Sequence, residues 1–317
     1  MNNTILVILH KTGQSFAYYD VQTGKTLRSI DTKPFPHEIC LSPDRKSFYV
    51  AEMGVRGVES TGPGGHTIAI YRTGTGEKTG EIDTGKYDRP HGLVTHANGR
   101  LYVTSESTQY LLIYDLNKNE LIQKVYLGQK CAHMVNTSHN GNRAYTANIF
   151  SNTITEIDTT DGRVIRHITV PERPEGMVCA PDDSLIYVVC REAKRIAVID
   201  AAHGEWIDSI PTGNGPVRIA MTPDGSQFVI PLFHSAAVQV IDRVTKVTQT
   251  LDVGPHPAGV AISPDGGLFF ISCEDEQQVY VFDMHTKELL NKIKTGPGCD
   301  AMVCLDRREI KFFDIWS

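Results

Sequence analysis

The feature that most constrains the fold is a repeat of about 42 residues. Its clearest copies contain the turns Thr222-Pro223-Asp224-Gly225 and Ser263-Pro264-Asp265-Gly266. Aligning the chain on the third residue of this turn gives seven anchors, Asp44, Asn98, Asn140, Asp182, Asp224, Asp265 and Arg307, separated by 54, 42, 42, 42, 41 and 42 residues. Each unit reads as four short strands with alternating apolar residues and Gly, Asn or Asp turns between them. This period predicts an all-β protein, a seven-bladed β-propeller of four-stranded antiparallel blades.

The first unit is incomplete, which indicates how the ring closes. Residues 4–30 contain three of a blade's four strands but no innermost strand. A suitable strand, Asp300-Ala301-Met302-Val303-Cys304-Leu305, lies at the other end of the chain. We therefore expect the last blade to be closed by both termini, which removes two free sheet edges. Residues 309–315 also read as a strand that would compete with 4–10 for the place beside it, and the sequence leaves this choice open.

The repeats resemble those of a known family. Strands such as Leu101-Tyr102-Val103-Thr104 and Ile186-Tyr187-Val188-Val189 are similar to those of YVTN-repeat β-propellers, which include YncE-like and lactonase-like proteins. The resemblance covers the whole chain, residues 1–317, and implies a single propeller domain. It implies little about function, because such propellers include enzymes, sensors and scaffolds.

Composition excludes several classes of partner. The net charge is −6 with acids and bases interspersed, so we expect no nucleic acid partner and no membrane association. The first ten residues lack the basic and long apolar regions of a signal peptide. The seven cysteines show no close pairing, which favours reduced thiols. These observations predict a cytoplasmic protein, and they leave its oligomeric state open.

The first period is longer than the others because of an insertion at about 54–66. This segment is rich in Gly and joins the second and third strands of its blade by register. That connection lies on the same face as the entries to the innermost strands, so a flap over the channel mouth is predicted. The alternative is a surface insertion without function, which loops tolerate at little cost.

One position of the repeat carries candidate chemistry. Seven residues before the successive anchors stand His37, His91, His133, Glu175, Val217, Ala258 and Asp300. This position is the entry of each innermost strand, so we expect the seven side chains to face the central channel at one level. Imidazole and carboxylate groups in such an arc suit one divalent ion of Zn, Mn, Fe or Ni, with His37, His91, His133 and Glu175 as predicted ligands. Whether Glu175 or Asp300 is the acidic ligand stays open, and a polar channel lining that holds water is the alternative.

Further residues are predicted around this metal. His10 and Glu52 end the second strands of their blades, and together with Asp300 they are the predicted acid and base groups. Arg218, Arg191 and His234 fall on the opposite side of the channel mouth and are predicted to bind a carboxylate of the substrate.

The favoured function is a metal-dependent hydrolase or lyase that acts on a small polar or carboxylate-bearing molecule. The layout resembles that of single-metal propeller enzymes such as lactonases, streptogramin lyase and α-hydroxyglycine lyase. The sequence contains no nucleophile elbow and no phosphate-binding loop. The alternative is a non-catalytic propeller that serves as a scaffold for protein partners or ligands.

Overall fold

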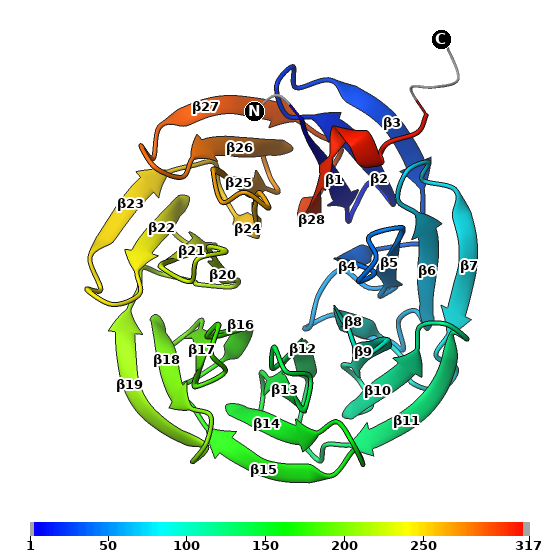
Figure 1. The fold of residues 1–317 in the computed structure, drawn as a ribbon, viewed down its shortest axis with the longest axis vertical. Coiled ribbons are helices and arrows are strands. Elements are labelled where there is room, and N and C mark those ends of the chain that lie inside the picture. Colours follow the sequence, from blue (N-terminus) through cyan, green and yellow to red (C-terminus); the bar gives the residue numbers. More distant parts are fainter. Residues whose placement is uncertain (1–2, 313–317) are drawn as a thin grey trace.

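The computed structural model describes residues 3–312, which form a ring of seven four-stranded antiparallel sheets around a central channel (Figure 1). The predicted seven-bladed β-propeller is therefore confirmed. In each blade one strand lies beside the channel and the following strands lie progressively further out.

We number the blades from the first complete sheet. Blade 1 contains β4 (Pro36–Leu41), β5 (Ser47–Glu52), β6 (Thr67–Arg72) and β7 (Lys78–Asp83), and blade 2 contains β8 (Pro90–His96), β9 (Arg100–Ser105), β10 (Tyr110–Asp115) and β11 (Glu120–Tyr126). Blade 3 contains β12 (Ala132–Thr137), β13 (Arg143–Asn148), β14 (Thr153–Asp158) and β15 (Val164–Thr169), and blade 4 contains β16 (Pro174–Cys179), β17 (Leu185–Cys190), β18 (Arg195–Asp200) and β19 (Glu205–Pro211). Blade 5 contains β20 (Ala220–Met221), β21 (Gln227–Leu232), β22 (Ala237–Asp242) and β23 (Thr248–Asp252), and blade 6 contains β24 (Pro257–Ile262), β25 (Leu268–Cys273), β26 (Gln278–Asp283) and β27 (Leu289–Lys294). Blade 7 contains β28 (Cys299–Asp306), β1 (Thr4–His10), β2 (Ser15–Asp20) and β3 (Thr26–Asp31).

The apolar core lies between the blades and not at the centre of the ring. Each interface between neighbouring blades holds one cluster of buried apolar residues. At the interface of blades 7 and 1, for example, the ring of Phe16 packs edge-on against Phe48 and Tyr71, with centroids 5.2 and 4.7 Å apart. Burial of apolar surface between the blades therefore stabilises the ring.

Both termini close blade 7, as predicted. The first strand β1 pairs with the last strand β28 in antiparallel register, from Thr4 opposite Asp306 to His10 opposite Cys299 (Figure 1). The expected competing strand at 309–315 was wrong over its described part. Arg307–Glu309 form a short 3-10 helix, η1, because the Asp306 side chain accepts the Arg308 N–H and caps it. Residues 313–315 lie outside the described residues.

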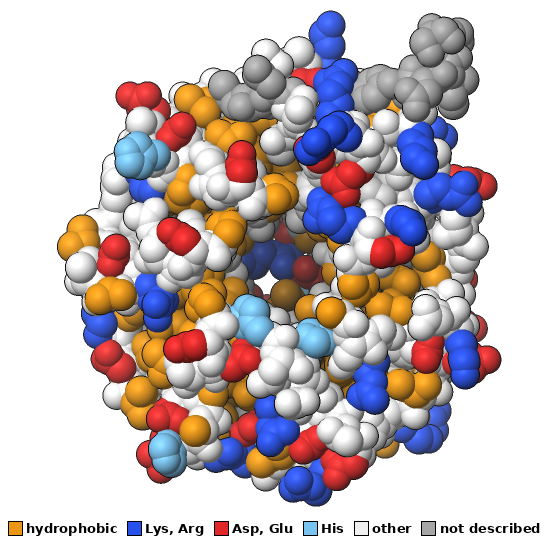
Figure 2. All heavy atoms as spheres, viewed as in Figure 1, with side chains coloured by type: hydrophobic (Ala, Val, Ile, Leu, Met, Phe, Trp, Pro, Cys, Tyr) orange, Lys and Arg blue, Asp and Glu red, His pale blue; other side chains and the backbone are white. Residues whose placement is uncertain are grey.

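The surface mixes charges of both signs, and the channel is visible as an opening at the centre of the ring (Figure 2). All seven cysteines are free thiols. Among residues 3–312, no helix has the length and apolar character needed to cross a membrane.

Candidate functional site

The channel widens into a cavity of about 670 Å³ at one end. All seven residues of the repeat position discussed above line it, namely His37, His91, His133, Glu175, Val217, Ala258 and Asp300. We call this set the channel ring. The repeat register thus brings together side chains that are up to 263 residues apart in the sequence.

The channel ring faces the cavity because the innermost strands bulge there. In blade 2, Pro90 pairs with Ser105 and Leu93 pairs with Val103, so two residues of β8 lie opposite one residue of β9. The same shift occurs between Ala132 and Val135 in blade 3. A bulge leaves a residue outside the ladder and turns its side chain, which aims the two histidines of these blades at the channel.

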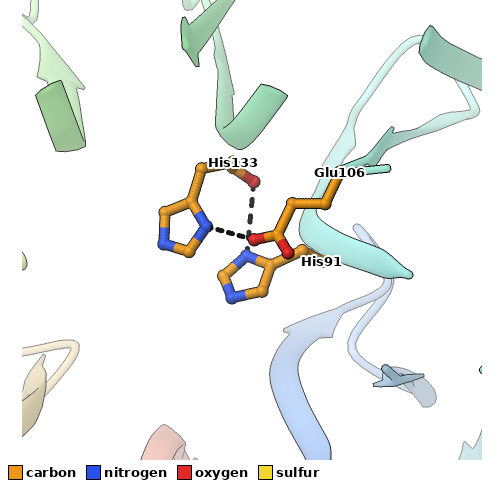
Figure 3. A group of neighbouring side chains, drawn as sticks. All are labelled: His91, Glu106 and His133. Carbon is orange, nitrogen blue, oxygen red and sulfur yellow. Dashed lines mark hydrogen bonds and ion pairs between the residues drawn. The ribbon is translucent and has the colours of Figure 1, made fainter. Parts of the chain in front are cut away.

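His91 and His133 form the most compact part of the site. Their rings are stacked with centroids 3.9 Å apart. Nδ1 of His91 lies 3.3 Å from the carbonyl oxygen of His133, and Nδ1 of His133 lies 2.6 Å from Oε1 of Glu106 (Figure 3). The Nε2 atoms of both rings point away from Glu106, and within residues 3–312 neither has a hydrogen-bond partner. Ligand atoms of these three residues lie within 4.8 Å of one another.

Burial makes the histidines neutral. It lowers the pKa values of His37 and His91 well below their ordinary value and that of His133 to about 3. The same effect raises the pKa of Glu106 to about 8. Near neutral pH the imidazoles are therefore uncharged, which is the form that binds metal ions.

His37 stands apart from the other two histidines. Its ring centroid is 5.1 Å from that of His91. Nε2 of His37 lies 3.0 Å from the carbonyl oxygen of Arg56, in the insertion, and Nδ1 lies 3.9 Å from Oδ2 of Asp300. Of the three histidines predicted as equal ligands, one is thus held by the protein backbone.

The wall opposite the stacked histidines is a network of ion pairs. Nη2 of Arg218 lies 2.5 Å from Oε1 of Glu38 and 3.2 Å from Oδ1 of Asp300. Nζ of Lys11 lies 3.1 Å from Oδ2 of Asp300 and 3.4 Å from Oε2 of Glu274. Burial alone would raise the pKa of Asp300, but the charges of Lys11 and Arg218 outweigh it and hold that pKa well below its ordinary value. An ionised carboxylate with two cationic partners is poorly suited to the predicted acid–base role.

Glu175 occupies a third environment in the cavity. Its Oε1 lies 2.8 Å from Nη1 of Arg191. Burial raises the pKa of Glu175 to about 7, although the charge of Arg191 opposes the shift. Glu175, which the sequence predicts as a metal ligand, is thus a carboxyl group whose protonation state changes near neutral pH.

The structure does not bring His10 and Glu52 into the cavity. His10 contacts the hydroxyl groups of Ser15 and Tyr19, each at 2.9 Å. Glu52 accepts hydrogen bonds from the backbone of Lys33 and the hydroxyl of Thr67. Both side chains therefore satisfy polar groups at strand ends, and their predicted catalytic role has no geometric support.

Three residues near the site were not predicted from the sequence, namely Lys11, Glu106 and Glu274. Each directly follows the end of a second strand, as the predicted Arg191 does; Lys11 and Glu274 line the cavity, and Glu106 contacts His133. Successive side chains of a strand point to opposite sides, so a shift of one residue changes the environment completely. The same register, advanced by one residue, would have found them.

The insertion contributes Arg56, Val58 and the segment up to Ser60 to the cavity lining. The guanidinium of Arg89 donates to the carbonyl oxygens of Ser60 and Gly62 at 2.6 and 2.5 Å. Glu59 lies 3.5 Å from Arg173 of the loop before β16. The insertion thus reaches from blade 1 across part of the cavity mouth. Arg218, Arg191 and His234 line the same cavity, as does Phe233.

Comparisons with known proteins give relatives of low identity. No protein-family model matches the chain. The uncharacterized protein YncE of Salmonella typhi is 24% identical over 257 residues, which cover 80% of this chain and 68% of YncE. Antigen Lp49 of Leptospira interrogans is 25% identical over 182 residues, or 50% of this chain and 40% of the antigen.

Solved structures share the fold over nearly the whole chain. The periplasmic gluconolactonase of Pseudomonas aeruginosa has a TM-score of 0.79 at 15% identity and covers 95% of this chain and 99% of its own. A functionally unknown protein of Desulfotomaculum acetoxidans has a TM-score of 0.78 at 13% identity, with 95% and 98% covered. These likenesses concern the fold alone. The chain is thus a seven-bladed β-propeller that is similar to YncE over 80% of its length, and a gluconolactonase is among the solved structures that share its fold.

Proposed function

We propose that the protein is a metal-dependent, lactonase-like hydrolase that acts on a small polar or carboxylate-bearing molecule in the channel cavity. The observation that carries this proposal is the pair of stacked, neutral imidazoles whose Nε2 atoms face the cavity without a partner in the described structure. Both rings line the cavity and are neutral, so each can offer the lone pair of Nε2 to an ion, which is the form in which imidazole binds metals.

The donor set fits a divalent cation. Imidazole nitrogen suits Zn, Mn, Fe and Ni, and two or three protein ligands leave positions open for a substrate. A carboxylate that holds the second ring nitrogen of a ligand histidine is a common companion of such sites, and Glu106 stands in that relation to His133. A cation bound at Nε2 of His133 would favour the state in which Nδ1 carries the proton of the 2.6 Å hydrogen bond and Glu106 is ionised.

The surrounding residues suit hydrolysis of an ester bond. The cation would supply Lewis acidity toward the substrate carbonyl. Glu175, with a pKa near 7, would take a proton from the attacking water. The Arg191 guanidinium has further N–H groups beyond its bond to Glu175 and would hold a substrate carboxylate, next to Phe233 and His234. The fold shared with a gluconolactonase favours ring-opening hydrolysis over elimination.

The test combines metal analysis with a lactone panel. Protein purified without an affinity tag is compared with His91→Ala, His133→Ala and, as the matched control, His139→Ala, whose exposed ring binds Asp183 outside the cavity. We expect near-stoichiometric metal and lactone opening in the parent and in His139→Ala, and neither in the two cavity variants. A parent that takes up none of Zn²⁺, Mn²⁺, Fe²⁺ and Ni²⁺ would overturn the proposal and favour a non-catalytic scaffold.

A further inference from the structure

A buried hydroxyl group connects the backbones that carry the two stacked histidines. Thr104, in β9, is fully buried, and it lies between β8 and β12. Its Oγ1 donates to the carbonyl oxygen of His133 at 2.6 Å and accepts the backbone N–H of Gly92 at 2.8 Å. Gly92 directly follows His91, so one side chain fixes both histidines to each other across two blades.

The close approach of these backbones requires glycine at position 92. A Cβ there would lie 2.6 Å from the carbonyl oxygen of His133 and 2.8 Å from the nitrogen of Val135. Both distances are far below van der Waals contact, and the atoms are backbone, which cannot move aside easily. The same carbonyl oxygen of His133 lies 3.3 Å from Nδ1 of His91, visible as the vertical dashed line in Figure 3. It is therefore the shared acceptor of the hydroxyl and the ring.

This bonding sets which nitrogen atom of His91 faces the cavity. If Nδ1 of His91 carries its proton toward the His133 carbonyl, Nε2 keeps a lone pair directed at the cavity. The ring centroids lie 3.9 Å apart and ligand atoms of the two residues lie within 4.8 Å of each other, a separation compatible with two ligands of one ion. A displacement of β12 relative to β8 would change that separation.

A second contact between a glycine N–H and a buried hydroxyl group offers a control within the same chain. At the contact between blades 6 and 7, the backbone N–H of Gly259 donates to Oγ of buried Ser272 at 2.8 Å. A Cβ on Gly259 would lie 2.2 Å from the carbonyl oxygen of Asp300. The glycine and its hydroxyl acceptor thus recur, but the channel residues of these two blades are Ala258 and Asp300 in place of two imidazoles.

We propose that Thr104 is a positioning residue that, with Gly92, sets the spacing and orientation of His91 and His133 for one divalent cation. The inference rests on the metal site of the proposed function but not on any catalytic activity. It attributes part of the metal affinity of the site to a hydroxyl group that does not itself bind the ion. Supporting groups of this kind typically change metal affinity by about 10-fold to 100-fold.

The experiment measures Zn²⁺ affinity by competition with a chromophoric chelator, and the visible spectrum of the Co²⁺-loaded protein. The variants are Thr104→Val, which keeps the shape but loses both hydrogen bonds, Thr104→Ser, which keeps the hydroxyl, and Ser272→Ala as control. We expect Thr104→Val to weaken Zn²⁺ binding by about 10-fold to 100-fold and to alter the Co²⁺ spectrum. Thr104→Ser should restore both, and Ser272→Ala should lower the melting temperature while keeping the parent affinity.

Two results would overturn the inference alone: unchanged Zn²⁺ affinity and Co²⁺ spectrum in Thr104→Val, or an equal loss of affinity in Ser272→Ala. If Thr104→Val does not fold, Thr104→Ala is measured in its place at low temperature, with the same expected loss. A parent that binds neither ion is a different outcome, because it overturns the metal site of the proposed function and this inference with it.

Discussion

The two walls of the cavity bury polar groups to the same degree and use them in opposite ways. His91 on one wall and Asp300 on the other are 2% and 3% exposed. Asp300 has two cationic partners, Lys11 and Arg218, which compensate its charge. Within the described part of the chain, the stacked histidines have hydrogen-bond partners only at Nδ1, and their Nε2 atoms lie toward the cavity. Burial of a polar side chain in this channel therefore does not by itself mark a binding site, and the two walls differ in whether a polar atom is left open to the cavity.

The largest expected effect tests whether the network of ion pairs around Arg218 and Asp300 stabilises the fold. Arg218→Met leaves Glu38 and Asp300 buried without their shared cation, and breaking such pairs costs about 3–5 kcal/mol. We expect urea denaturation to show a free energy of unfolding lower by that amount. Lys246→Met, which breaks the exposed ion pair with Asp208, is the control and should change stability little. Equal stability of the two variants would refute a structural role for this wall.

The next prediction ranks His91 and His37 by their contribution to metal binding, according to whether Nε2 of the ring has a hydrogen-bond partner in the described structure. His91→Ala removes a ring with an unpartnered Nε2 and should weaken Zn²⁺ binding more than about 100-fold, beyond the effect of a supporting residue. His37→Ala removes a ring whose Nε2 is bound to the carbonyl of Arg56, so we expect a loss below about tenfold. Calorimetric titration of both variants checks the order. Equal losses would show that all three histidines bind the ion, as the sequence predicts.

A third prediction concerns pH. Glu175 must be deprotonated to act as a base, and its pKa is about 7. The rate of lactone opening should therefore rise as the pH increases through about 7 and reach a plateau above it. Glu175→Gln should remove this dependence and most of the rate while leaving bound metal unchanged. A pH profile that persists in Glu175→Gln would assign the proton transfer to another group.

The smallest effect concerns the insertion. Arg89→Ala removes the donors to the carbonyl oxygens of Ser60 and Gly62. Hydrogen exchange should therefore become faster over residues 54–66. Unchanged exchange would mean that other contacts, such as Glu59 with Arg173, are sufficient to hold the segment.

The sequence was informative wherever the repeat alone determines the position of a residue in the ring. The anchors placed the channel ring, since strand order and register repeat from blade to blade. They did not show that Asp300 pairs with Lys11, because residues 289 positions apart meet only through ring closure. The anchors also did not show that Lys11, and not His10, lines the cavity. The two residues are adjacent, and a bulge in β28 beside His10 decides which side chain enters the cavity. Pairing between side chains is a property of three-dimensional packing, which periodicity does not record.

The ion pair between Lys11 and Asp300 has a consequence for how the protein is made. Lys11 follows the first strand of the chain, and Asp300 begins the strand that completes blade 7. During synthesis on a ribosome, Lys11 and Arg218 emerge long before Asp300, the carboxylate that they share. The network of ion pairs is therefore complete only after β28 has joined blade 7.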